Sequence, residues 1–131
     1  MAKTFTPPMA QNTVLAKKQV STANTNRDGT GTIVDLYTAP TEGARISYVR
    51  AKATVTTTAG MVRLFVKDSG GTYRLIGEIS IAAATPSATV PTAEGEYYPT
   101  EPWLLLNGDV VGASTHNAEA INVFLFGSAY N

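Results

Sequence analysis

Cysteine is absent from this sequence, which excludes thiol catalysis, disulfide bridges and any zinc site with cysteine ligands. Charged residues are also scarce, at 15% of the chain against about 25% in an average soluble protein. The ten basic and ten acidic residues form no block of like charge, so the sequence predicts no nucleic-acid partner. Every apolar run is too short to span a bilayer, so it predicts no membrane partner either.

Recognisable catalytic motifs are equally absent. The one histidine, His116, stands at the end of a predicted strand, and the chain has no Gly-x-Ser-x-Gly nucleophile elbow. Glu94, Glu96 and Glu101 lie in a proline-rich segment, without the apolar neighbours that would raise a carboxyl pKa for acid–base work. We therefore expect no enzyme activity and no catalytic residues.

One stretch, residues 24–35, imitates the spacing of an EF-hand calcium loop. Asn24 and Asp28 hold loop positions 1 and 5, Gly29 holds position 6, and Asp35 holds position 12. The loop offers only two carboxylates, however, and the residues that follow it indicate a strand instead of the required helix. An Asp-Gly turn that leads into a strand explains this segment, so we expect neither a metal nor any other cofactor.

Strand patterns dominate from about residue 31 onward. Residues 47–57 alternate between an apolar and a polar face, and residues 62–66 and 73–81 repeat that pattern. An amphipathic helix would need apolar residues every three to four positions, which these segments lack. Further strands are predicted over residues 13–20, 32–38, 88–90, 103–106, 109–115 and 121–126, which gives eight or nine in all. The last of them is apolar on both faces, which favours a central position in its sheet.

Turn signals separate these strands. Residues 58–60 and 68–71 contain glycine between two apolar runs, and Asn107-Gly108 lies between residues 103–106 and 109–115. Asn-Gly in such a position is typical of a type I′ hairpin, because both central residues of that turn need positive φ. The turns and strands together predict an all-β fold: an antiparallel β-sandwich, with a jelly roll as the first interpretation and an immunoglobulin-like sandwich as the second.

Two segments stand apart from this pattern. Residues 1–28 are polar and contain Pro7-Pro8, so we expect an extended N-terminal arm that precedes a sandwich domain of residues 29–131. Residues 85–102 contain four prolines, which predicts a long surface excursion between strands. The first residues show no apolar core of a signal peptide, so we expect synthesis in a cytoplasm.

Two surface features are interpreted as ordinary. Phe65 lies on the polar side of its strand with Tyr48 as a possible cross-strand neighbour, an arrangement that could offer a stacking platform to a sugar or a nucleic-acid base. Without basic residues around it, ordinary cross-strand packing is favoured. Lys17 and Lys18, the only adjacent basic pair, are interpreted as solvated.

The chain from Asp28 onward resembles small bacteriophage virion proteins, the β-sandwich proteins that decorate or cement the capsid. The segments that carry this resemblance are Asp28-Gly-Thr-Gly-Thr-Ile-Val-Asp-Leu-Tyr-Thr-Ala39, Gly43-Ala-Arg-Ile46, Met61-Val-Arg-Leu-Phe-Val66, Leu75-Ile-Gly-Glu-Ile79, Asn107-Gly-Asp-Val-Val-Gly-Ala-Ser-Thr115 and Ile121-Asn-Val123. The likeness is one of strand and turn rhythm over about three-quarters of the chain.

The resemblance implies a structural protein of the capsid exterior, made in the host cytoplasm. It would bind the major capsid protein as a homo-oligomer, with a trimer favoured. Other virion parts (a head fibre, a tail component or a portal adaptor) and a non-viral carbohydrate- or peptide-binding sandwich remain as alternatives. The residues that we expect at an interface lie in the arm, in the 85–102 segment or next to it: Phe5, Pro7, Pro8, Leu15, Tyr97, Tyr98 and Trp103.

The defective calcium loop and the strand pattern give a first testable prediction. The purified protein should show a β-type far-ultraviolet circular dichroism spectrum, and a chelator such as EDTA should leave its melting temperature unchanged. A decrease of several degrees with the chelator would contradict the interpretation of residues 24–35 as a simple turn.

Overall fold

Segments with alternating apolar and polar residues form the strands of this protein. The computed structural model describes residues 10–130, and this part of the chain contains nine strands and no helix. In chain order the strands are β1 (Ala10–Val20), β2 (Val34–Thr38), β3 (Ala44–Ala53), β4 (Gly60–Lys67), β5 (Arg74–Ile81), β6 (Glu94–Tyr97), β7 (Trp103–Leu105), β8 (Val110–Thr115) and β9 (Ile121–Tyr130). The predicted all-β fold is confirmed. Within the same residues there is accordingly no helix able to cross a membrane.

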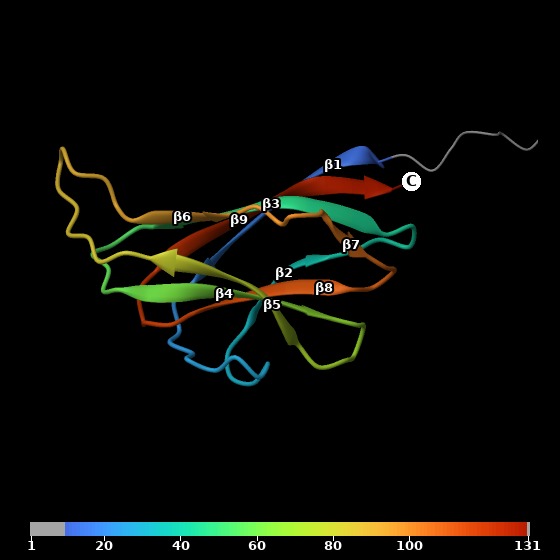
Figure 1. Ribbon diagram of the computed structural model, residues 1–131, viewed down its shortest axis with the longest axis horizontal. Coiled ribbons are helices and arrows are strands. Elements are labelled where there is room, and N and C mark those ends of the chain that lie inside the picture. Colours follow the sequence, from blue (N-terminus) through green and yellow to red (C-terminus); the bar gives the residue numbers. More distant parts are fainter. Residues whose placement is uncertain (1–9, 131) are drawn as a thin grey trace, which may run out of the picture.

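The strands form two antiparallel sheets that lie one above the other (Figure 1). Sheet A has the order β1-β9-β3-β6, with β7 also paired to β3, and sheet B has the order β2-β8-β4-β5. Strand β9 lies between β1 and β3, which confirms the predicted central position of the last apolar run. All connections except β4–β5 and β6–β7 pass from one sheet to the other, so the two layers are joined many times.

The hydrophobic core fills the space between the two sheets. Alternate residues of each strand point into it, as the period of two in a β-strand requires. In β3, for example, Val49 and Ala51 are fully buried while Arg50 between them is partly exposed. The main core residues are Ile46, Val49, Ala51, Ile121, Val123 and Leu125 of sheet A and Val62, Leu64, Ile79, Val111 and Ala113 of sheet B.

A β-bulge in sheet B changes which residues of β5 face the core. Leu64 pairs with Gly77 but its neighbour Phe65 pairs with Leu75, so one residue of β5 has no partner. Because an extra residue reverses the alternation, Leu75 points outward with Phe65, whereas Ile79 and Ile81 further along β5 point into the core. The prediction that residues 73–81 keep a single apolar face is therefore wrong.

Three predicted segments differ from the structure in their strand content. Strand β3 ends at Ala53, because the chain leaves sheet A there, so the strand predicted over residues 47–57 is too long. The strand predicted over residues 88–90 is part of a turn, whose end residues 87 and 90 share reciprocal backbone hydrogen bonds. Strand β6 lies inside the predicted surface excursion of residues 85–102, where Gly and Tyr alternate with Glu along the edge of sheet A.

The Asn107-Gly108 turn does not form the predicted type I′ hairpin. Only Gly108 has a positive φ, of 83°, whereas that turn type needs two such residues. The strands on either side do not pair with each other: β7 pairs with β3 in sheet A, and β8 pairs with β2 and β4 in sheet B. The turn signal located a sharp reversal correctly, but a local signal does not determine which strands become partners.

The N-terminal segment confirms the strand predicted over residues 13–20, as part of β1, but its described residues do not form the expected arm. Residues 1–28 were expected to form an arm outside the sandwich, and the described part of this segment contains the edge strand β1, paired with β9 along its length. Val14 and Val20 point into the core with exposed fractions of 8% and 1%. Past β1, the backbone of Asn24 donates a hydrogen bond to the carbonyl of Thr115. An edge strand with one solvent-exposed face contains few apolar residues, and for this reason the sequence of β1 resembles that of an extended arm.

Because β1 completes the core, shortening Val20 should destabilise the domain. We expect Val20→Ala to lower the free energy of unfolding by about 2 kcal/mol, since it removes buried methyl groups and leaves a cavity. Lys18→Ala, an exposed position two residues earlier in the same strand, is the matched control and should change it by less than about 0.5 kcal/mol. Urea denaturation measures both, and equal stability of the two variants would contradict a structural role for β1.

Candidate functional site

The outer face of sheet B is covered by the chain itself. Arg63 and Phe65 of β4 point to this outer face, yet only 2% and 0% of their surfaces are exposed. The covering chain is the loop of residues 21–33, which we call the cover segment; it runs below β4 and β8 in Figure 1. At Gly112 a Cβ atom would lie 2.7 Å from the side chain of Ile33, so the two layers are in close contact. This face therefore offers little free surface.

Asn24 holds the cover segment in shape. Its Nδ2 group donates to the carbonyls of Thr30 and Thr32, both at 3.0 Å, and its Oδ1 accepts from the backbone N–H of Asn26 at 3.0 Å. The side chain is 95% shielded, with only 5% exposed. Buried amides are stable when their donors and acceptors are all engaged, so Asn24 is a structural residue of the loop.

The two acids of the calcium-like spacing are also engaged locally. Oδ1 of Asp28 accepts from the hydroxyl of Thr30 at 2.6 Å and from its backbone N–H at 3.1 Å, and these bonds lower the pKa of Asp28. Asp35 accepts a hydrogen bond from the hydroxyl of Tyr73. Residues 10–130 contain no group of three or more His, Cys, Asp or Glu side chains placed to hold a metal ion. The turn interpretation of this stretch agrees with these bonds.

Arg63 is the centre of a polar network beneath the cover segment. Its Nε lies 3.1 Å from Oε2 of Glu78, and the same oxygen lies 2.7 Å from Nε of Arg27. Nη1 of Arg63 contacts the carbonyl of Asn24 at 3.4 Å and Nδ1 of His116 at 3.2 Å. Because arginine only donates, His116 must accept at Nδ1 and carry its ring proton on Nε2. The network thus places His116 as a structural acceptor.

The carboxylates considered as an acid–base pair lie on sheet A. Glu94 forms ion pairs with Arg50 at 2.9 Å and with Lys52 at 3.2 Å. Glu96 points to the same side of β6, as predicted for residues two apart in a strand, and Glu101 lies in the loop before β7. All three are exposed, so their surroundings resemble those of ordinary surface carboxylates.

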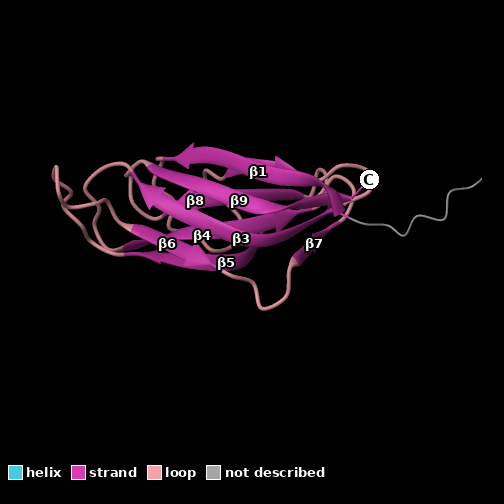
Figure 2. Cartoon of the chain, turned by 90° about the horizontal axis from the view of Figure 1, so that it is seen from above, coloured by secondary structure: helices cyan, strands magenta, loops and turns pink. Residues whose placement is uncertain are grey.

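The outer face of sheet A, which we call face A, is formed by β1, β9, β3 and β6, which lie side by side in Figure 2. A row of apolar side chains crosses β1, β9 and β3 and ends next to β6. Leu15 of β1 pairs with Phe126 of β9, and Phe126 pairs with Tyr48 of β3. The Tyr48 ring stacks on Phe126 at 5.0 Å and on Tyr98, next to the end of β6, at 4.5 Å. Leu15 is 50% exposed and Tyr98 is 67% exposed. We call these four residues the aromatic row.

Tyr48 is the most enclosed hydroxyl group of this row. Its burial raises the pKa of Tyr48 to about 12, and the neighbouring Tyr98 hydroxyl and Glu96 carboxylate act in the same direction. A phenol with so high a pKa stays neutral at every pH at which the protein is expected to be folded. The Tyr48 hydroxyl therefore adds no charge to the row.

The aromatic pair considered from the sequence is not formed. Phe65 lies in sheet B beneath the cover segment, where it packs edge to face against Tyr73 at 6.2 Å, and Tyr48 lies in sheet A. The partners of Tyr48 are Phe126 and Tyr98. The regular alternation of aromatic and aliphatic residues along β9 was the signal in the sequence that could have indicated the row.

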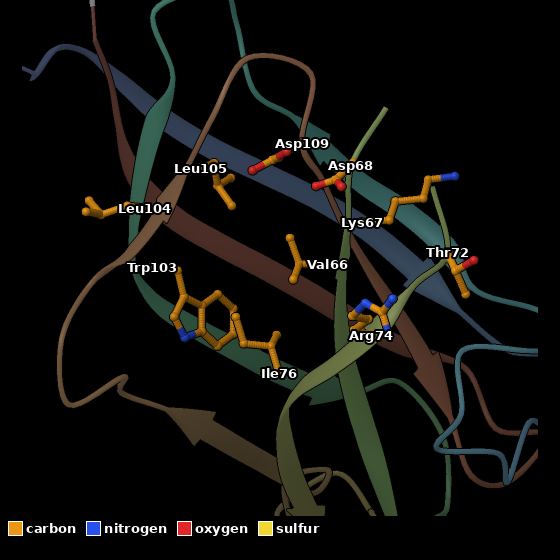
Figure 3. A pocket seen from close by; sticks show the side chains of 10 residues that line it. All are labelled: Val66, Lys67, Asp68, Thr72, Arg74, Ile76, Trp103, Leu104, Leu105 and Asp109. Carbon is orange, nitrogen blue, oxygen red and sulfur yellow. The ribbon is translucent and has the colours of Figure 1, made fainter. Parts of the chain in front are cut away.

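A second apolar surface lies at the end of the sandwich where β7 meets the β4–β5 turn. A cavity of about 330 Å³ opens there, and Figure 3 shows Val66, Ile76, Trp103 and Leu105 around it with charged side chains at its margin. Next to it, Leu104 and Leu106 are 71% and 73% exposed. We call the cavity and these two leucines the β7 end.

The expected interface residues fall into three groups. Phe5, Pro7 and Pro8 lie outside the described residues. Leu15 and Tyr98 lie on the same face A, at opposite ends of the aromatic row. Tyr97 and Trp103 are partly buried and pack against each other at 5.4 Å, next to the β7 end. Their role in binding a partner stays a prediction. The sequence analysis missed Phe126, Leu104 and Leu106.

No known protein family matches this sequence, and no curated protein is significantly similar to it. The two apolar surfaces and the polar network are therefore the observations from which a function can be argued.

The network around Arg63 gives a test of how the cover segment is held. Glu78→Gln removes the charge that faces a nearly inaccessible guanidinium, and we expect it to lower the free energy of unfolding by about 1–3 kcal/mol. Glu101→Gln, an exposed carboxylate in a loop, is the matched control and should have little effect. The hydrogen bond from Arg27, its charge and the contact with Arg63 lower the pKa of Glu78 in the folded protein.

A depressed pKa in the folded state means that this stabilisation is present above the usual pKa of glutamate and is lost as the pH falls through the lower, folded value. The difference in stability between wild type and Glu78→Gln should accordingly be full at pH 7 and shrink in acid. Urea denaturation at several pH values measures it, and a difference that does not depend on pH would contradict the ion-pair account.

Proposed function

We propose that this protein is a structural component of a bacteriophage particle, a decoration or cement protein that binds the major capsid protein on the outside of the shell. The observation that supports this best is the presence of two separate apolar surfaces, face A and the β7 end, on one stiff sandwich. In this proposal one surface contacts the shell and the other contacts a second copy of the chain.

The β7 end is our candidate for the capsid contact. Its cavity can accept one large apolar side chain. Leu104 and Leu106 are exposed on either side of Leu105 in the chain, and the Leu104 side chain points away from the cavity in Figure 3. Gly77 of β5 allows Tyr97 and Trp103 to pack tightly behind the cavity, since a Cβ there would lie 3.0 Å from the tyrosine ring. Rigid walls reduce the entropy lost on binding, which favours lasting attachment.

The low charge of the chain also supports lasting contact with a capsid shell. Threonine and alanine take the place of charged residues over much of the sequence. Small side chains lose little rotamer entropy when a partner covers them, and few charges need to be desolvated. These properties suit a protein that stays bound to a shell, and they suit a transient, electrostatically steered partner much less.

We also propose that the sandwich is a jelly roll. Strand pairs β1·β9, β2·β8 and β4·β5 are antiparallel, and β3 pairs antiparallel with both β6 and β7. Such nested pairs are what one long hairpin, folded back at the β4–β5 turn and wound around a core, would produce. The alternation of the pairs between the two sheets supports the same winding. Jelly rolls serve many functions, so this topology alone does not favour the capsid role.

Carbohydrate binding is a second candidate, because of the stacked rings on face A. Tyr98 is exposed at the end of the stack, and a shallow hollow of about 330 Å³ lies nearby between Arg50, Lys52, Phe124 and Phe126. Sugars bind to exposed aromatic rings flanked by polar groups. The rings of Tyr48 and Phe126 stack on each other, however, which leaves less free ring surface than a flat platform would.

Binding to capsids tests the main proposal. We expect Leu106→Asp to reduce co-sedimentation with shells assembled without the protein by about tenfold or more, because a carboxylate would have to be buried at the contact. Val90→Asp is the matched control, since Val90 is an exposed apolar residue in a loop distant from the β7 end in sequence. Both variants should keep the wild-type melting temperature. Undiminished retention of Leu106→Asp would exclude this contact, and binding of the wild type to glycans but not to shells would favour the second candidate.

A further inference from the structure

Face A carries a second row of side chains directly beside the aromatic row. Lys17 of β1 pairs with Phe124 of β9, Phe124 pairs with Arg50 of β3, and Arg50 pairs with Glu96 of β6. We call these four residues the charged row. Residues of one row lie side by side across the strands, so the row places a basic side chain at the β1 edge and an acidic one at the β6 edge.

The two charges at the ends of this row are available to a partner. Lys17 and Glu96 are both exposed, and neither forms an ion pair within residues 10–130. Arg50, in the middle of the row, is already paired with Glu94. Face A thus combines an uncharged aromatic row with a neighbouring row that is positive at one end and negative at the other.

We propose that face A binds a second copy of this chain, face to face, around a two-fold axis that runs parallel to the strands between β9 and β3. Such an axis exchanges the two edges of the sheet but keeps each row at its own height. Each row therefore meets itself in reverse order across the interface, as an isologous contact requires.

The reversed order matches every row with a complementary one. In the aromatic row, Leu15 meets Tyr98 of the second copy and Phe126 meets Tyr48. In the charged row, Lys17 at the β1 edge meets Glu96 at the partner's β6 edge, and the symmetry forms this contact twice. A two-fold axis across the strands would instead place β1 against β1, which gives Lys17 no carboxylate. Charge complementarity thus selects the axis along the strands.

The size of the face fits a reversible pair. Strands β1, β3 and β9 contain 10 or 11 residues, which corresponds to a length of about 33 Å. Three such strands about 4.8 Å apart span about 14 Å, and β6 adds only four residues, so each copy would cover on the order of 500 Å². About 1,200 Å² in total is the lower limit of specific protein interfaces. The pair should therefore dissociate on dilution.

This pairing does not depend on the proposed capsid role. It concerns the purified protein alone, and it uses face A, whereas the proposed shell contact uses the β7 end. It also differs from the trimer that the resemblance implies, because a two-fold axis builds pairs.

Charge exchange at the ends of the charged row tests the proposal by sedimentation equilibrium of the full chain over a range of concentrations. Wild type should approach twice the mass of one chain as the concentration rises. Lys17→Glu places like charges together twice, so it should raise the dimer dissociation constant by about tenfold or more, and Glu96→Lys should do the same. The double exchange, Lys17→Glu with Glu96→Lys, restores both contacts and should recover most of the wild-type affinity.

Lys18→Glu is the matched control, because Lys18 is the next residue of the same strand and points to the other side of the sheet; it should leave the dissociation constant unchanged. Tyr98→Ala, which removes an exposed ring, should weaken the pair without lowering the melting temperature. A protein that remains a monomer at all concentrations, a trimer mass, or a double exchange that is weaker than both single variants would overturn this arrangement.

Discussion

The ion pair between Arg63 and Glu78 is the interaction on which the shape of this protein depends. A guanidinium that is 2% exposed is stable only with partners for its charge and its N–H groups. Those partners come from β5, from the cover segment and from the start of the β8–β9 connection. The hydrogen bonds and the ion pair of Arg63 therefore hold three parts of the chain, distant in sequence, together on the outer face of sheet B.

The consequence is a sandwich with two unlike outer faces. On sheet B the cover segment encloses Phe65 as a second small apolar layer, supported by the edge-to-face contact with Tyr73. On sheet A, the aromatic row keeps Leu15 and Tyr98 half or more exposed. Apolar side chains that gather on one face of a small domain are typical of contact with another protein. The covered face is structural, and the open face is available for binding.

In a shell-binding protein the two apolar surfaces would bind different partners. Face A is uncharged along one row and complementary to itself along the next, which favours a second copy of the same chain. The β7 end is concave and apolar, with charged residues at its margin, which favours a protruding side chain of a different protein. A particle protein with both surfaces could bind its shell through two linked domains and so gain avidity from each weak contact.

The sequence by itself determined the fold class and much of the strand content. Period-two alternation identified β3 and β4, because it follows from the geometry of a single strand. The apolar run of residues 121–126 indicated the central position of β9, although only one face of β9 is fully buried. The spacing from Asn24 to Asp35 was correctly interpreted as a turn, because Asx turns form within a few residues.

The tertiary structure alone decided which strands are partners and which faces are covered. Strands β7 and β8 flank a sharp turn yet belong to different sheets, and β1 joins the sheet through β9, more than a hundred residues away along the chain. Phe65 and Tyr48 have similar local surroundings in the sequence, but one is enclosed by the cover segment and the other stacks on face A. A residue's own strand fixes the side to which it points. Whether another part of the chain lies on that side depends on contacts between distant segments, and the function proposed here rests on the face that those contacts left open.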